Sequence, residues 1–461
     1  MAKVEKHKTE AAAAATPPPS KGKKINVHYL TRVEGHGNIV AEIDASGKVS
    51  ICRWEIPEAP RFFEAMLIGR SYEDVHHITS RICGICSIGH QLSSLQATED
   101  AFGVQISEQT MLLRKLALHA ENLQSHFLHV GYLALPDFMG APSVLPLAAS
   151  HKEEVLAVVA CHRTANRMSD MICGRTIHPQ RMVPGGFAKL PTAEDLISLK
   201  AMLEAAVPKA KAILDVVVAV ADNIPKFHRA TEYVALVSDA EYPFYWGEIG
   251  SSKTQRRPNQ LYKDVTREYC LPQSTAKWTK GVEDSYMVGA LARFNLNHDK
   301  LSHLAKEAAR KLGLKAPSHN PFHITLAQLV ECFHCVEDAL HIIDTLLARG
   351  MRDEAPVPIK TFACKGVGAV EVPRGILFHA YEYDENGRIA SADCVIPTNQ
   401  NHANIQRDLD GLLPTLTGLS EAEIELKLSM LVRAYDPCIS CSTHHIDLTG
   451  DSNKLVKFVR K

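Results

Sequence analysis

The sequence predicts an α+β protein that is mainly α, with a core of long bundled helices and antiparallel β elements at the periphery. Alternating apolar and polar residues occupy 25–57 and 358–397, where turn residues separate short strands. Between these two regions, apolar residues recur at helical spacing over long segments. The expected helices lie at about 106–134, 151–174, 192–221, 298–312 and 323–349. No segment repeats another, so we expect one intertwined unit.

Local signals set several boundaries of these elements. Residues 60–80 are expected to be helical, and the helix after them is expected to stop at Gly103. Thr192, followed three residues later by an aspartate, predicts a capping box at the start of a helix. Ser420 predicts a similar cap for the last helix. That helix is expected to end before Asp436, because the residue before a proline is disfavoured in a helix.

Composition excludes several classes of protein. The 461 residues have a net charge of −1, which gives no electrostatic reason to bind nucleic acid. No apolar run is long enough to span a membrane, and the first residues lack the apolar region of a signal peptide. Twelve cysteines without a disulfide pattern favour a reducing, cytoplasmic location. Residues 1–24, rich in Lys, Ala and Pro, are expected to form a flexible tail.

Two cysteine pairs near opposite ends of the chain are the strongest chemical signal. Cys83 and Cys86 lie in R-I-C-G-I-C, with His90 four residues later, and Cys438 and Cys441 lie in D-P-C-I-S-C. Four thiolates brought together would form a soft, sulfur-rich metal site. A structural zinc site usually has its two pairs roughly 15–20 residues apart, which these pairs do not match. A redox disulfide within either pair is the other alternative.

A third pair, Cys332 and Cys335, serves as a control. It lies within the apolar helical pattern of 323–349 and has no glycine or proline beside it. Buried helix cysteines are the expected state of such residues.

The motifs R-x-C-G-x-C-x-x-x-H and D-P-C-x-x-C-x-x-H together resemble those of the catalytic large subunit of nickel–iron hydrogenases, and the resemblance extends over about 27–461. It implies that Cys83 and Cys438 are terminal nickel ligands, and that Cys86 and Cys441 bridge nickel and iron. It also implies carbon monoxide and cyanide on the iron, and the fold of that subunit. The chain is shorter than periplasmic members and is more similar to the cytoplasmic branch.

The same resemblance assigns a proton acceptor. Glu34 lies in R-V-E-G-H, which matches a family motif, and would take the proton from the sulfur of Cys438. Heterolytic cleavage of dihydrogen requires such a base. Without the resemblance, the simplest interpretation of Glu34 is a surface carboxylate paired with Arg32.

Four other residues are placed around the metal ligands by this matching. Arg374, in P-R-G, would overhang the open coordination position, where its permanent charge can polarise dihydrogen; by itself, the tripeptide reads as an ordinary turn. The remaining residues of this group are His90, Asp137 and Asp436.

A second metal site is also implied by the resemblance. Glu64 would bind a magnesium or iron ion together with the backbone carbonyl of Cys394 and the side chain of His444. A hard cation of this kind prefers oxygen ligands. The alternative for Glu64 is an exposed charge on a helix surface.

The function implied is reversible, heterolytic cleavage of dihydrogen into protons and electrons. The sequence has no nucleotide-binding glycine motif and no further cysteine set for a cluster. Electrons are therefore expected to leave through a small iron–sulfur subunit, followed by a further electron-transfer subunit. A dihydrogen sensor, a non-catalytic metal-binding relative and a proton-pumping respiratory relative are the alternatives.

Maturation is expected to involve accessory proteins that deliver the diatomic ligands. The catalytic domain is expected to be 25–444, with 445–461 as a C-terminal extension. An endoprotease is expected to remove this extension after His444 once nickel is in place. Its removal would let the terminal segment fold over the metals.

Overall fold

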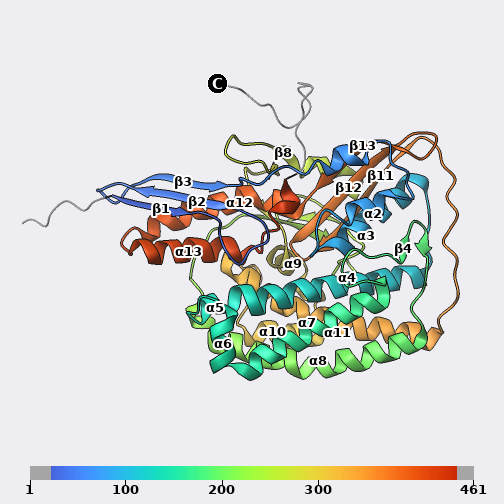
Figure 1. Ribbon diagram of the computed structural model, residues 1–461, viewed down its shortest axis with the longest axis horizontal. Helices are drawn as coiled ribbons and strands as arrows, with labels where there is room; N and C mark the ends of the chain where they lie inside the picture. The colour runs from blue at the N-terminus through green and yellow to red at the C-terminus, as the bar shows by residue number, and fades with distance from the viewer. Residues whose placement is uncertain (1–21, 444–461) are drawn as a thin grey trace, which may run out of the picture.

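Long helices lie side by side and form one layer of the protein (Figure 1). The computed structural model describes residues 22–443. The layer contains α4 (Glu108–Leu128), α7 (Lys152–Cys173), α8 (Ala193–Ala219), α10 (His303–Lys311) and α11 (Ile324–Arg349). Helix α7 contacts α4 and α8, and α11 contacts α4, α8 and α10. The predicted bundle of long helices is confirmed.

Three antiparallel strands near the N-terminus form a meander at one end of the molecule (Figure 1). They are β1 (Lys23–Val27), β2 (Asn38–Ile43) and β3 (Val49–Glu55), and neighbouring strands pair in sequence order. The predicted β region at 25–57 is confirmed, although its first strand begins at Lys23, within the segment expected to be a flexible tail.

A second antiparallel sheet carries the helix that follows the first cysteine pair. It consists of β11 (Cys364–Val372), β12 (Gly375–Tyr383) and β13 (Ile389–Val395). Helix α3 (Ser87–Phe102) lies against β11 and β12 and is almost entirely buried. Because α3 is buried against it, this sheet forms part of the core and is not only peripheral to the helix bundle.

The predicted helix caps are present. Thr192 and Asp195 form a reciprocal capping box at the start of α8, with backbone-to-side-chain distances of 3.0 and 3.1 Å. Ser420 and Glu423 form another at the start of α13 (Glu421–Ala434). Gly103 ends α3 with a φ of 67°, a left-handed conformation that favours glycine.

Several elements differ from the prediction. Residues 60–80 form two short helices, α1 (Phe63–Leu67) and α2 (Val75–Thr79), because the chain turns at Gly69 with a φ of 78°. Helix α4 ends at Leu128 and continues as one π-helical segment, η1 (His129–Ala134). Residues 298–300 form a separate 3₁₀ turn before α10.

The sequence did not predict the short elements between the long helices, nor the 16-residue helix α12. The remaining helices are α5 (Leu135–Phe138), α6 (Val144–Ser150), α9 (Ala290–Asn297) and α12 (Pro397–Leu412). The remaining strands are β4 (Met182–Val183), β5 (Gly186–Phe187), β6 (Glu232–Val237), β7 (Glu248–Ser251), β8 (Arg267–Tyr269), β9 (Trp278–Lys280) and β10 (Tyr286–Met287). Within residues 22–443, no helix has the length and apolar composition that crossing a bilayer requires.

The contact between α3 and β11 depends on glycine. A methyl group at Gly368 would clash with the carbonyl oxygen of Ser93 and would lie 2.7 Å from the backbone nitrogen of Ala97, both on α3. We therefore expect Gly368→Ala to lower the free energy of unfolding by about 1–3 kcal/mol, the usual cost of overpacking a core. Gly418→Ala is the control, because a methyl group there meets no atom within 4 Å. Equal denaturant midpoints for the two variants would contradict this account of the contact.

Candidate metal centre

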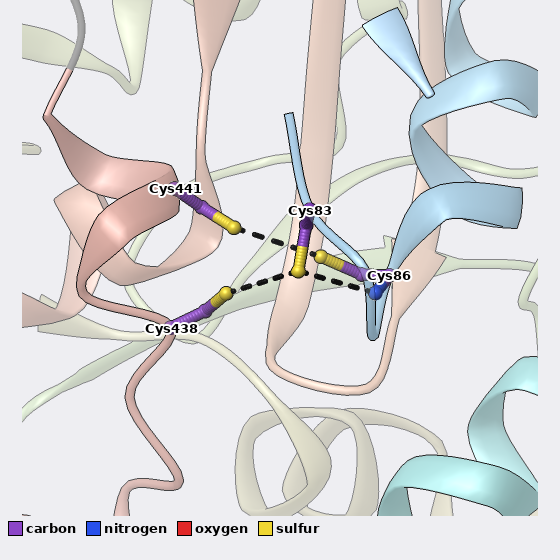
Figure 2. Close-up of side chains that lie close together, drawn as sticks. All are labelled: Cys83, Cys86, Cys438 and Cys441. Atoms are coloured by element: carbon purple, nitrogen blue, oxygen red, sulfur yellow. Dashed lines mark hydrogen bonds between the residues drawn. The ribbon is translucent and has the colours of Figure 1, made fainter. Parts of the chain in front are cut away.

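The four cysteines of the two pairs meet in one buried site (Figure 2). The Sγ atoms of Cys83 and Cys438 are 3.3 Å apart, and those of Cys86 and Cys441 are 3.9 Å apart. All four sulfur atoms lie within 4.8 Å of one another, and each cysteine is at most 5% exposed. Because each close contact joins one pair to the other, the structure favours a shared four-thiol site over two separate redox pairs.

Two loops that end in helical turns place these thiols. Cys86 is the residue that immediately precedes α3. On the other side, the chain leaves α13 and bends at Asp436, which has a φ of 49°. The backbone of Cys438 then bridges to Glu34, and Cys441 lies in the 3₁₀ helix η7 (Ser440–Ser442). Figure 2 shows the four side chains pointing toward one another from these two segments.

The surrounding polar groups favour thiolate at Cys83. Its sulfur accepts hydrogen bonds from the backbone nitrogens of Ile85 and Cys86 at 3.2 and 3.3 Å. Hydrogen bonds with the other three thiols, Cys438 first, hold the pKa of Cys83 well below its ordinary value. A soft metal ion prefers such ligands, and its binding would release the protons of the remaining thiols.

Arg374 and Asp436 lie beside the thiols. Arg374 Nη2 is 2.8 Å from Asp436 Oδ1, and both residues are buried. Burial by itself would lower the pKa of Arg374, but the negative charges of Asp436 and the nearby thiolates raise it well above its ordinary value. Its Nη1 atom is buried without a hydrogen-bond partner in the described chain. The guanidinium therefore stays charged and keeps one donor free.

Glu34 lies against the second cysteine loop and does not pair with Arg32. Its carboxylate accepts hydrogen bonds from the hydroxyl and, at 3.1 Å, from the backbone nitrogen of Ser440. Its carbonyl oxygen accepts from the backbone nitrogen of Ile439 at 3.0 Å. Arg32 instead binds Asp137. The alternative of a local Arg32–Glu34 pair is thus not what the structure shows.

Asp137 and His90 occupy different surroundings. Asp137 lies between Arg32 and Arg433, with Arg433 Nε at 3.2 Å from its Oδ2. His90 Nδ1 is 3.1 Å from His379 Nε2, and burial lowers the pKa of His90 to about 4. Within residues 22–443, the Nε2 atom of His90 is buried without a hydrogen-bond partner. His90 is therefore a neutral side chain at the start of α3 with one nitrogen unused.

The proposed ligands of the second metal site are described only in part. Glu64 is buried, so it is not an exposed helix charge, and its Oε1 accepts from the backbone nitrogen of Cys394 at 2.8 Å. The same oxygen lies 2.9 Å from Lys277 Nζ. His444 lies outside the described residues.

Charge around Glu64 is suited to a cation. Lys277 is also 2.8 Å from Glu268 and 3.9 Å from Asp393, so one ammonium faces three carboxyl groups. Burial, with a smaller effect of the negative charges of Asp393 and Glu64, raises the pKa of Glu268 to about 7. Carboxyl groups thus outnumber ammonium groups around Lys277, and a divalent cation with oxygen ligands would help to balance them.

Three residues at these sites were missed by sequence reasoning. They are His379 beside His90, Lys277 beside Glu64, and Glu121, whose carboxylate binds the first turn of α3. His379 lies in β12, Glu121 lies in α4 and Lys277 immediately precedes β9, and none of them has a motif around it. The only sequence signal for these three residues is that each is a polar residue among apolar positions that are expected to be buried.

Comparisons with known proteins agree with this site. The family model described as "Nickel-dependent hydrogenase" matches residues 61–157 and 254–444, and a second, "HoxL-like", matches 24–59. The chain is 34% identical over 429 residues to the alpha subunit of sulfhydrogenase 1 of Pyrococcus furiosus, covering 92% of this chain and 98% of that protein. It is 30% identical to the matching subunit of the F420-non-reducing hydrogenase vhc of Methanococcus voltae, covering 94% and 97%.

A solved structure gives the same result for the fold. An NAD⁺-reducing [NiFe]-hydrogenase in its H2-reduced state superposes with a TM-score of 0.82 at 28% identity, covering 92% of this chain and 99% of that chain. The chain therefore belongs to the nickel-dependent hydrogenase family. It is the catalytic large subunit of a nickel–iron hydrogenase, an oxidoreductase that acts on dihydrogen. A sensor or non-catalytic relative is not favoured.

Removing one thiol of the site tests the assignment of the pairs. Cys441→Ser is expected to lose most of its nickel, because it removes a soft ligand on which the site depends. Cys335→Ser is the matched control, since Cys335 is equally buried but lies in α11 as part of the third pair. It should keep its nickel. Elemental analysis of the purified variants decides this, and equal nickel loss in both would show that the pairs are misassigned.

Proposed function

We propose that this chain cleaves dihydrogen heterolytically and reversibly at a nickel–iron centre held by Cys83, Cys86, Cys438 and Cys441. The convergence of these four buried sulfur atoms is the observation that supports it. By resemblance to the family, Cys83 and Cys438 would be terminal ligands of nickel, and Cys86 and Cys441 would bridge it to iron. Such a centre, with carbon monoxide and cyanide on its iron, supplies the position where dihydrogen binds and gives up two electrons.

The proton is proposed to leave through Cys438 and Glu34. Heterolysis needs a base beside the metals, and the sulfur of Cys438 is buried away from water. Glu34 is adjacent to Cys438 through their backbone bridge and is only half-buried. The hydroxyl and backbone nitrogen of Ser440 hold its carboxylate against the loop. Glu34 is thus suited to carry a proton from the buried thiol toward the surface.

Arg374 is proposed to act on dihydrogen before cleavage. Its Nε and Nη2 atoms are held by Asp436, which leaves the charged Nη1 donor unpaired within the described chain. Asp436 would orient the guanidinium, and the fixed positive charge would polarise dihydrogen. His90 would contribute its Nε2 atom, which is unpaired among residues 22–443, to the surroundings of the metal ligands. Asp137 would act at longer range, by fixing Arg32 close to Glu34.

A magnesium or iron ion is proposed at the second site. Glu64, the carbonyl of Cys394 and His444 would hold it. The excess of carboxyl groups over ammonium groups around Lys277 supports this proposal. This chain's residues would order water there and so help protons to exit.

Electron transfer is proposed to require partner subunits. Among residues 22–443, the only cluster of metal-ligating side chains is the four-cysteine site itself. The relatives are named as single subunits of hydrogenases, which supports an assembly of several chains. We assign a small iron–sulfur subunit, another electron-transfer subunit, maturation proteins and an endoprotease as partners. The complex would work in the cytoplasm.

Glu34→Gln tests the proton route. The amide oxygen can still accept from the backbone nitrogen of Ser440, and the amide NH2 can donate to the Ser440 hydroxyl, but the side chain cannot take up a proton at neutral pH. The variant is expected to keep its nickel while exchange of dihydrogen with solvent deuterons falls about 100-fold or more, the usual contribution of a general base. Glu34→Asp should lose less, because it keeps an acid one methylene further away.

Glu58→Gln is the matched control for this experiment. Glu58 is also half-buried and lies near the same loop, but its carboxylate binds His36 at 2.8 Å. Its exchange rate should stay at the wild-type level. If Glu34→Gln also exchanges at that rate with full nickel content, Glu34 has a structural role and the proton takes another path.

A further inference from the structure

The helix that follows the first cysteine pair begins in an unusual way. Cys86 is the N-cap residue of α3, a position where Ser, Thr, Asp or Asn normally accepts a hydrogen bond from the first turn. The thiol of Cys86 faces Cys441 instead and caps no backbone nitrogen in the described chain. Because the thiol is committed to the metal centre, the first-turn N–H groups of this 16-residue helix need another acceptor.

Glu121, from the middle of α4, is that acceptor. Its Oε2 atom accepts from the backbone nitrogen of Ile88 at 2.6 Å and from that of Gly89 at 3.0 Å. Its Oε1 atom lies 3.1 Å from the same nitrogen of Gly89. The side chain is completely buried, and the nearby charge of Arg374 acts on it more weakly than these backbone hydrogen bonds do. The positive end of the α3 dipole is therefore its main electrostatic partner.

Gly89 makes this approach possible. A methyl group there would lie 2.7 Å from Glu121 Oε1 and would clash with the side chain of Val372 on β11. The first turn of α3 is thus held on one side by a carboxylate from α4 and on another by the sheet. Glu121 and Val372, which make these contacts, both lie outside the two cysteine motifs.

The backbone N–H groups of this loop form two separate sets of hydrogen bonds. Backbone nitrogens of Ile85 and Cys86 point to the sulfur of Cys83, whereas those of Ile88 and Gly89 point to Glu121. A shift in the start of α3 would therefore move both thiols of the first pair relative to those of the second pair.

We propose that Glu121 is a positioning residue, which caps α3 in place of Cys86 and thereby fixes Cys83 and Cys86 for metal binding. The proposal rests on the proposed nickel–iron centre. Either protonation state of the carboxyl keeps an oxygen that can accept these N–H groups. Burial raises the pKa of Glu121 to about 8, so the amide of glutamine is a close substitute for its protonated form.

Glu121→Met tests the cap, because methionine fills a similar volume but accepts no strong hydrogen bond. We expect its nickel affinity to fall about tenfold or more, as is usual when a partner that orients a metal ligand is lost. The infrared bands of the iron-bound diatomic ligands should broaden or shift. Glu121→Gln should recover most of the nickel. Gly89→Ala, which displaces the carboxylate without removing it and also crowds Val372, should lose nickel like Glu121→Met.

Thr192→Ala is the matched control, since it removes the cap of α8, which packs against α7 and α11. It should lower stability but leave nickel and the infrared bands unchanged. Nickel retained after dialysis against a chelator, measured on the matured complex, is the readout. The nickel content of the wild type tests the proposed function, and the differences among variants test the cap. Wild-type nickel and bands in Glu121→Met or Gly89→Ala, or equal losses in Glu121→Gln and Glu121→Met, would overturn the proposal.

Discussion

Bringing four buried thiols within 4.8 Å of one another is the constraint on which the rest of the structure depends. Thiolates repel one another and lose hydration when buried, so their positions must be imposed by the surrounding backbone. The start of α3 and the turn after α13 impose them, because each carries one pair. Residues 355 positions apart, Cys83 and Cys438, consequently meet at 3.3 Å.

The elements around the site can be understood from this constraint. The glycines of β11 let α3 approach the sheet closely, which fixes the helix that begins at Cys86. The loop containing Glu34 bonds to the second pair through backbone and side chain, so the proposed base and the thiol it serves move together. Arg374 is held by Asp436, two residues before Cys438. Glu34 and Arg374, which are proposed to act on the proton and on dihydrogen, thus each hydrogen-bond to a residue beside the second cysteine pair.

The sequence predicted the parts of this arrangement that are encoded locally. The two cysteine motifs, the caps at Thr192 and Ser420 and the long helices are each encoded in a continuous stretch of sequence, and the structure contains the caps and the long helices and brings the two motifs together. Glu121 was not predicted, because its partner is a helix start 32 residues earlier in the sequence and its own neighbours give no signal. Apart from the two cysteine pairs, which the family resemblance joined, contacts between distant segments were likewise not predicted. Arg32 lies two residues from Glu34, yet it binds Asp137, because the loop that carries both residues folds against η1 and α5.

The central claim is that the four thiols hold a nickel–iron centre. Infrared spectroscopy of the matured protein, on a sample whose nickel content is also measured, tests it most directly. Stoichiometric nickel together with sharp bands from iron-bound carbon monoxide and cyanide is the predicted result. A fully matured chain that contains neither nickel nor these bands would contradict the account.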